Sequence, residues 1–196
     1  GDQRIKKIDD RRGSNKNLGI IYNPKICIIS RLVKGKGHIE LIEYMANLLS
    51  KNDEFLKLKL FILGDGPLRN NITELINYYK LEKNIQMLGL VEQEKVIAII
   101  NECDFAIHPS TNEGLSISCL QYLASCLPTL PKKYGPSYDV FGANTLYYKD
   151  YLSFEKSFLQ LTHINKLHSI SKNFHKVRHK AKWNKVLDLY ASIYKN

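Results

Sequence analysis

Residues Asp104 to Ser125 read D-F-A-I-H-P-S-T-N-E-G-L-S-I-S-C-L-Q-Y-L-A-S. The apolar run that ends at His108 predicts a buried strand, and the apolar residues from Ile117 onward recur at helical spacing, so the polar residues between them predict a loop. A helix that starts where a buried strand ends presents free N–H groups and a partial positive charge, which suit an anion such as phosphate. Glu113 in this loop would repel a phosphate, so we expect its carboxylate to face something else, such as a hydroxyl-rich group.

Strands and helices alternate along the rest of the chain. The expected strands are Lys25–Ser30, Phe55–Leu63, Asn84–Leu88, Cys103–His108 and Thr145–Tyr148, and Leu127–Pro131 allows at most a short one. Helical spacing falls between and after these strands, in residues 39–49, 72–79 and 91–101 and in Tyr151–Thr162 and Ile164–Tyr194. This alternation predicts an α/β fold with a doubly wound, Rossmann-like parallel sheet and right-handed crossovers.

The first 23 residues are polar and charged, which predicts a linker or tail. We therefore expect one domain over residues 24–196, with its C-terminal helices from about residue 151.

Distinctive loops follow the expected strands: Arg31–Gly37, Gly64–Pro67, Gly89–Leu90 and Pro109–Ser118. The carboxyl ends of parallel strands meet at one edge of a sheet, where such folds bind ligands, so we expect these loops to converge. Arg31 and Lys36 could hold two phosphates there, the guanidinium as a fork and the ammonium as a point charge. The alternative is that both are ordinary surface cations. Gly64–Pro67 is most simply a tight turn.

The chain of 196 residues carries a formal net charge of +10. That balance fits a solvated basic face, an anionic ligand, an anionic membrane surface or nucleic acid. No apolar run approaches the ~20 residues of a membrane span, and no signal peptide is visible. The four cysteines stand in apolar segments without a C-x-x-C pair, so we expect buried thiols of a reducing compartment.

Several familiar sites are excluded. Gly35-Lys36-Gly37 lacks the third glycine of a dinucleotide fingerprint, because Glu40 stands there, and the chain has no phosphate-binding P-loop motif. His175 and His179 share a helix face without a third metal ligand. They belong to a basic C-terminal helix that lacks the interleaved aromatic residues typical of nucleic-acid binding, although this helix could meet anionic lipid.

Four motifs in order resemble a known family: Ser30-Arg31-Leu32 with Lys36-Gly37, Leu63 to Arg69, Met87-Leu88-Gly89, and His108-Pro109-Ser110 with Glu113-Gly114. Together they resemble the C-terminal half of GT-B-fold glycosyltransferases of family 4, called group 1. The resemblance runs from about Asn23 to the C-terminus. It implies a domain that binds a nucleotide-diphosphate sugar, with a UDP-sugar favoured. It also implies a hexosyltransferase that retains configuration, needs no metal and acts on a glycan or lipid-linked acceptor.

The resemblance also implies roles for individual residues. Arg31 and Lys36 would bind the donor diphosphate together with the backbone of Leu115, Ser116, Ile117 and Ser118. Leu88, Leu90 and Val91 would contact the base. Glu113 would act as the catalytic carboxylate and bond the hydroxyls of the transferred sugar.

The chain departs from the family pattern at one position above all. The family's second glutamate, which bonds the ribose, is Gln121 here, and an amide oxygen can still accept from ribose hydroxyls. The implied enzyme is a cytoplasmic, bacterial glycosyltransferase of surface-polysaccharide or lipid-linked glycan synthesis, peripheral at the inner face of the membrane, whose N-terminal acceptor domain is missing from this chain. Two alternatives stay open. One is a degenerate, non-catalytic nucleotide-sugar or assembly module, and the other is a nucleic-acid or membrane binder acting through the basic helix.

Overall fold

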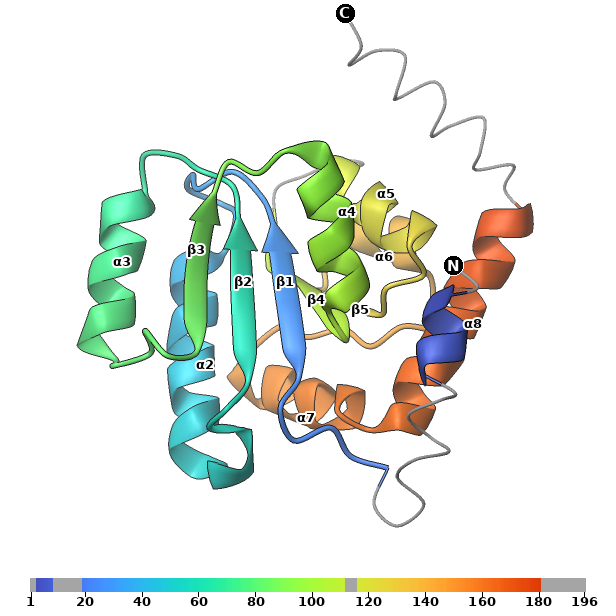
Figure 1. Ribbon diagram of the computed structural model, residues 1–196, viewed down its shortest axis with the longest axis horizontal. Helices are drawn as coiled ribbons and strands as arrows, with labels where there is room; N and C mark the ends of the chain where they lie inside the picture. Colours follow the sequence, from blue (N-terminus) through green and yellow to red (C-terminus); the bar gives the residue numbers. More distant parts are fainter. Residues whose placement is uncertain (1–2, 9–18, 112–115, 181–196) are drawn as a thin grey trace, which may run out of the picture.

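The computed structural model of the chain describes residues 3–8, 19–111 and 116–180. Its centre is a five-stranded sheet in the order β3-β2-β1-β4-β5 (Figure 1). The strands are β1 (Lys25–Ile29), β2 (Lys59–Leu63), β3 (Ile85–Gly89), β4 (Phe105–His108) and β5 (Thr129–Pro131). Every pairing in this sheet is parallel, which confirms the predicted α/β, doubly wound architecture.

Helices cover both faces of the sheet (Figure 1). They are α2 (His38–Lys51), α3 (Arg69–Tyr78), α4 (Gln93–Glu102), α5 (Ile117–Ala124), α6 (Gly135–Phe141), α7 (Tyr151–Leu161) and α8 (Ile164–Lys180), with a 3-10 turn η1 (Asp53–Phe55). Helix α2 packs against α3 and α7, whereas α4 contacts β1 and α5 packs against α8. Because both faces are covered, the strands can be continuously apolar.

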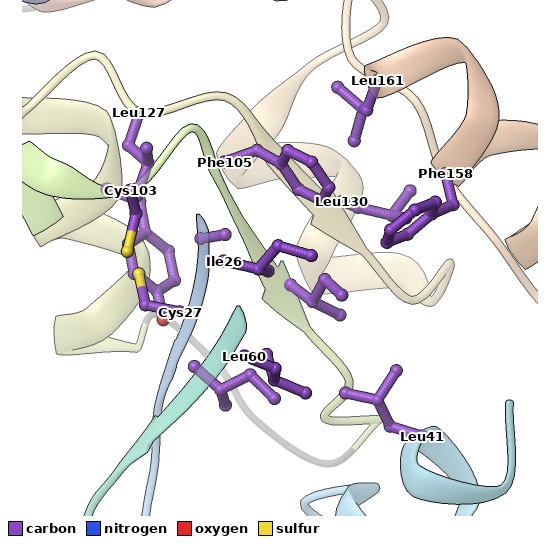
Figure 2. Packing of buried hydrophobic residues seen from close by; sticks show 14 of the residues in the cluster. Ile26, Cys27, Leu41, Leu60, Cys103, Phe105, Leu127, Leu130, Phe158 and Leu161 are labelled. Carbon is purple, nitrogen blue, oxygen red and sulfur yellow. The ribbon is translucent and has the colours of Figure 1, made fainter. Parts of the chain in front are cut away.

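Strand β1 shows how the two faces are filled. Its residues Ile26, Cys27 and Ile28 are almost completely buried. Figure 2 shows Cys27 near Cys103 and Leu127, with Ile26 turned the other way toward Phe105. This alternation is the period-two pattern of a strand. All four cysteines are free and buried, as their apolar surroundings in the sequence predicted.

The predicted strand from Phe55 to Leu63 starts too early. The structure places Phe55 in η1, where its N–H donates to the carbonyl of Asn52, and β2 begins only at Lys59. Phe55 is buried because its ring packs edge-on against Phe158 of α7, with ring centroids 5.8 Å apart. Its apolar character reflects this tertiary contact and not strand pairing.

The predicted last strand, Thr145–Tyr148, is also wrong. Only Tyr148 makes a bridge, to Lys132, and no strand forms between these residues. Tyr148 is buried among aromatic rings, and it meets Phe154 edge-on with ring centroids 5.2 Å apart. Aromatic clustering therefore explains the apolar run that resembled a strand.

The segment that the sequence predicted as a linker or tail is partly described. Residues 3–8 form a short helix in which Arg4 and Ile8 are buried, and Ile20 bridges His163 at the start of α8. Figure 1 shows this helix beside α8. The described part of the segment thus packs on the domain, while the boundary between residues 23 and 24 stays a prediction. The predicted Ile164–Tyr194 helix is seen from Ile164 to Lys180, and its remainder lies outside the described residues.

We predict that Tyr122→Phe lowers the free energy of unfolding by about 1–2 kcal/mol, because one hydrogen bond to a backbone N–H is lost. Tyr122 of α5 is fully buried, and its hydroxyl accepts a 2.8 Å hydrogen bond from the N–H of Ile29 at the end of β1. Urea unfolding measures this change as a lower midpoint at constant m-value. Tyr78→Phe is the matched control, since that ring is 77% exposed. Equal losses in both variants would contradict the role assigned to the Tyr122 hydroxyl.

Candidate functional site

A cavity of about 580 Å³ opens at the carboxyl edge of the sheet. Its walls come from the ends of β1 and β2, from the β3–α4 connection with α4, and from the start of α5. The lining residues are Ile29, Ser30, Arg31, Leu63, Gly64, Asp65, Leu90, Val91, Val96, Ser116, Ile117, Ser118 and Gln121. The chain runs outward from β1 through β2 to β3 and then crosses back to β4, so this cavity lies at the topological switch point, where doubly wound folds bind ligands.

The start of α5 forms one wall of the cavity. Ser116 occupies the N-cap position in an extended conformation, but its side chain caps no backbone N–H group. Its hydroxyl is instead 2.7 Å from the hydroxyl of Ser118. The first-turn N–H groups of α5 are therefore left by the cap side chain to another acceptor, and Ile117 and Ser118 both line the cavity. The helix start is suited to hold an anion there.

Two cations stand close to this helix start. Arg31 is exposed and lines the cavity, whereas Lys36 is half-buried and does not. Burial lowers the pKa of Lys36, and the positive charge of Arg31 lowers it further. The two cations thus feel one another, and an anion between them would relieve their repulsion.

A close backbone approach fixes the loop that carries both cations. Gly37 has a φ of 76°, and a Cβ atom placed on it would lie 2.3 Å from the carbonyl oxygen of Pro109. Only glycine fits such a contact. The β1–α2 loop therefore touches the start of the β4–α5 loop, and the two segments that carry the predicted anion-binding groups are held together.

Two buried histidines lie beneath the cations. Burial, followed by the charge of Lys36, lowers the pKa of both His38 and His108 to about 4. His38 lies with its Nε2 atom 3.3 Å from the hydroxyl of Ser30. Both rings are consequently neutral at pH 7, so the positive charge at this edge comes from Arg31 and Lys36.

The structure brings most of the predicted site residues together. Those that line the cavity are Arg31, Leu90, Val91, Ser116, Ile117, Ser118 and Gln121. Lys36 stands near the cavity without lining it, and Leu88 on β3 is half-exposed and does not line it either. Glu113 and Leu115 lie outside the described residues.

Sequence reasoning missed two lining residues and only partly recognised a third. Val96 and Ser30 reach the cavity, although the spacing of α4 marked Val96 only as a core residue. Asp65 lines the cavity as well, but its carboxylate also accepts a 2.7 Å hydrogen bond from the N–H of Gly66 and lies 3.3 Å from Arg69. The predicted tight turn at Gly64–Pro67 is thus tied down by Asp65. A helix residue one turn beyond a strand-end loop is the signal that would have identified Val96.

No group of three or more His, Cys, Asp or Glu side chains that could hold a metal ion occurs among the described residues. Over the same residues, no helix is both long and apolar enough to cross a bilayer.

Residues 11–176 match the family described as glycosyl transferases group 1. The chain belongs to this family. Among curated relatives, it is 30% identical over 179 residues to the uncharacterised glycosyltransferase MJ1069 of Methanocaldococcus jannaschii, which covers 87% of this chain and 44% of that protein. It is 33% identical over 118 residues to an N-acetylgalactosaminyltransferase of Campylobacter jejuni, named as acting on an N-acetylgalactosamine-N,N'-diacetylbacillosaminyl-diphospho-undecaprenol. That match covers 60% of this chain and 30% of the relative.

Solved structures of glycosyltransferases share the fold. The structure of S. aureus TarM in complex with UDP superimposes with a TM-score of 0.68 at 21% identity, over 90% of this chain and 36% of TarM. This likeness confirms the predicted Rossmann-like, GT-B type of domain. The chain spans less than half the length of the curated relatives that it matches.

We predict that the two buried histidines make the domain less stable as the pH falls. Each imidazole has an unfolded pKa near 6.5 and a folded pKa of about 4. The unfolded chain therefore takes up protons first, and the stability is present above about pH 6.5 and is lost as the pH falls toward 4. For each histidine the expected loss between pH 8 and pH 5 is about 2 kcal/mol.

Urea unfolding of the wild type, His38→Asn and His108→Asn at both pH values measures this effect. Each variant should lose about 2 kcal/mol less than the wild type between pH 8 and pH 5, because one titrating imidazole is gone. An unchanged pH dependence in both variants would contradict the lowered pKa values.

Proposed function

We propose that this domain binds a nucleotide-diphosphate sugar, most favourably a UDP-sugar, in the cavity at the carboxyl edge of the sheet. In the proposal, the whole protein transfers the sugar to a glycan or lipid-linked acceptor and retains its configuration. The observation that carries the proposal is the joint placement of Arg31 and the uncapped start of α5 on one cavity at the switch point. Membership of the glycosyl transferases group 1 family and the UDP complex of TarM support the same ligand class.

The proposed diphosphate site combines three kinds of positive potential. Arg31 would grip one phosphate through its planar fork, and Lys36 would supply a point charge beside it. The first-turn N–H groups of α5, at Ile117 and Ser118, would meet the same phosphates, with Leu115 and Ser116 completing the segment. Such a site stabilises the departing diphosphate by fixed charges and dipoles, and the proposal includes no metal.

The base and the ribose occupy the rest of the cavity in this proposal. Leu90 is 84% exposed beside Val91 in the β3–α4 connection, and an exposed apolar side chain at a cavity rim is suited to contact a flat base. Leu88 stays in the proposal as a neighbouring contact. Gln121 lies one helical turn beyond Ile117 on the cavity wall, where its amide oxygen can accept from a ribose hydroxyl.

Glu113 is proposed to bond the hydroxyls of the transferred sugar as the catalytic carboxylate. The acceptor would be held by a further domain of the whole protein. We also propose that the enzyme works in the cytoplasm, peripheral to the inner face of a membrane. The net charge of +10 is consistent with contact to anionic lipid.

We predict that Arg31→Gln and Lys36→Gln each weaken UDP binding by about 1.5–3 kcal/mol, or roughly 10- to 100-fold in Kd, because a charged hydrogen bond to phosphate is lost. Isothermal titration of UDP measures both values. Lys34→Gln is the matched control, since it removes the same charge from the same loop at an exposed residue that does not line the cavity. Unchanged binding in Arg31→Gln and Lys36→Gln would overturn the proposed phosphate site.

A second candidate function rests on Gln121. This residue lines the cavity at the place where the family pattern has a glutamate, so the domain could be a degenerate module that binds nucleotide sugars weakly without transfer. In that case Gln121→Glu should strengthen UDP-glucose binding about tenfold, because a carboxylate accepts ribose hydroxyls more strongly than an amide does. Titration of UDP-glucose against both chains decides the matter. Equal or weaker binding by Gln121→Glu favours the enzyme, in which the amide is the working group.

A further inference from the structure

Arg4 makes a buried contact far from the cavity. Its side chain is 5% exposed, and each of its three nitrogen atoms donates to a different backbone carbonyl. Nε donates to Ser125 at 3.0 Å, Nη1 donates to Cys103 at 2.7 Å, and Nη2 donates to Ile100. A buried guanidinium with three acceptors is well satisfied.

The three carbonyls belong to the C-terminal ends of two helices. Ile100 is in the last turn of α4, Cys103 is its C-cap, and Ser125 is the C-cap of α5. The last carbonyls of a helix lack partners within it and carry its partial negative charge, so a cation there is favourable. Lys7 strengthens the same arrangement, since its Nζ atom lies 3.1 Å from the carbonyl oxygens of both Asn101 and Glu102. The short helix of residues 3–8 thus fastens the ends of α4 and α5 to each other.

The opposite ends of these two helices reach the cavity. Val96 lies in α4, Leu90 and Val91 stand just before this helix, and Ser116, Ile117, Ser118 and Gln121 belong to the start of α5. These helices have 10 and 8 residues, so each spans about 12–15 Å from the Arg4 contacts to the cavity. A hydrogen-bonded helix over this length moves as a rigid rod. A shift at the C-terminal ends would therefore change the width of the cavity.

We propose that Arg4 is a positioning residue for the ligand cavity: by joining the C-terminal ends of α4 and α5, it sets the distance between the base-side wall and the phosphate-side wall. The inference rests on the proposed function for the identity of the ligand. The geometry also requires arginine. A lysine keeps the positive charge at the helix ends, but its single ammonium group cannot spread three donors in a plane over two helices.

UDP titration against the wild type, Arg4→Lys, Arg4→Gln and Asn84→Ala tests the proposal, with each protein held well below its own thermal midpoint. Asn84 is the matched control because it is also buried and its side-chain amide donates to two carbonyls, of Leu56 at 2.9 Å and Leu58 at 3.1 Å, before β3 begins. It touches neither α4 nor α5 through these bonds. Loss of its side chain should lower the thermal midpoint without altering the Kd for UDP.

We expect Arg4→Gln to weaken UDP binding about 3- to 10-fold, and Arg4→Lys to weaken it by a similar factor while keeping more of the thermal stability. Hydrogen exchange should quicken at the amides of α4 and of the first turn of α5 in both variants and stay unchanged there in Asn84→Ala. A Kd within twofold of the wild type in Arg4→Lys, with quickened exchange confined to the contacted ends, would overturn the proposal and leave Arg4 a purely stabilising residue.

The two proposals fail in different ways. If the wild type does not bind UDP, the proposed function is wrong. The positioning role is then tested by exchange alone, and unchanged exchange at the start of α5 in Arg4→Lys overturns it. If the wild type binds UDP and Arg4→Lys binds it equally well, only the positioning role is wrong.

Discussion

The hydrogen bonding of β1 to a parallel neighbour on each side is the constraint on which the rest of the structure depends. Residues 25–29 pair with β2 over their whole length, and Ile26 and Cys27 pair with β4. Because all three strands point the same way, their loops end at one edge of the sheet. Because β1 lies between β2 and β4, the chain must reverse its direction of winding there, and this reversal opens the cavity. The ligand site is therefore a consequence of strand order.

Burial at that edge also decides where the charge is. His38 and His108 are removed from water and stay neutral at pH 7, while Arg31 remains exposed and Lys36 half-buried. The positive field of the site is thus carried by two flexible side chains and by the backbone dipoles of α5. Protonation of imidazoles contributes nothing to it near neutral pH. A site of this kind holds its charge over the pH range in which most nucleotides are fully ionised.

The sequence was sufficient to predict the layers, the parallel sheet and most of the residues on the cavity wall, because continuous apolar runs and strand-end loops are local signals. It failed where burial arises between segments far apart in the chain. Phe55 and Tyr148 are apolar because they meet aromatic rings of α7, and this contact cannot be told from strand pairing in one dimension. Arg4 looked like one charge in a polar segment. Its three acceptors are all backbone carbonyls, which leave no trace in the identity of the residues that contribute them.

The contact of Arg4 also bears on how such domains are delimited. The family match begins at residue 11 and therefore leaves out the short helix of residues 3–8. An expressed fragment trimmed to the matched range would keep the whole sheet and the whole cavity wall, but the carbonyls at the ends of α4 and α5 would lose a buried cation. Such a fragment could fold and still give a misleadingly weak affinity for nucleotides. Comparisons of ligand binding among homologous domains of this type should therefore use fragments cut at the same place relative to this helix.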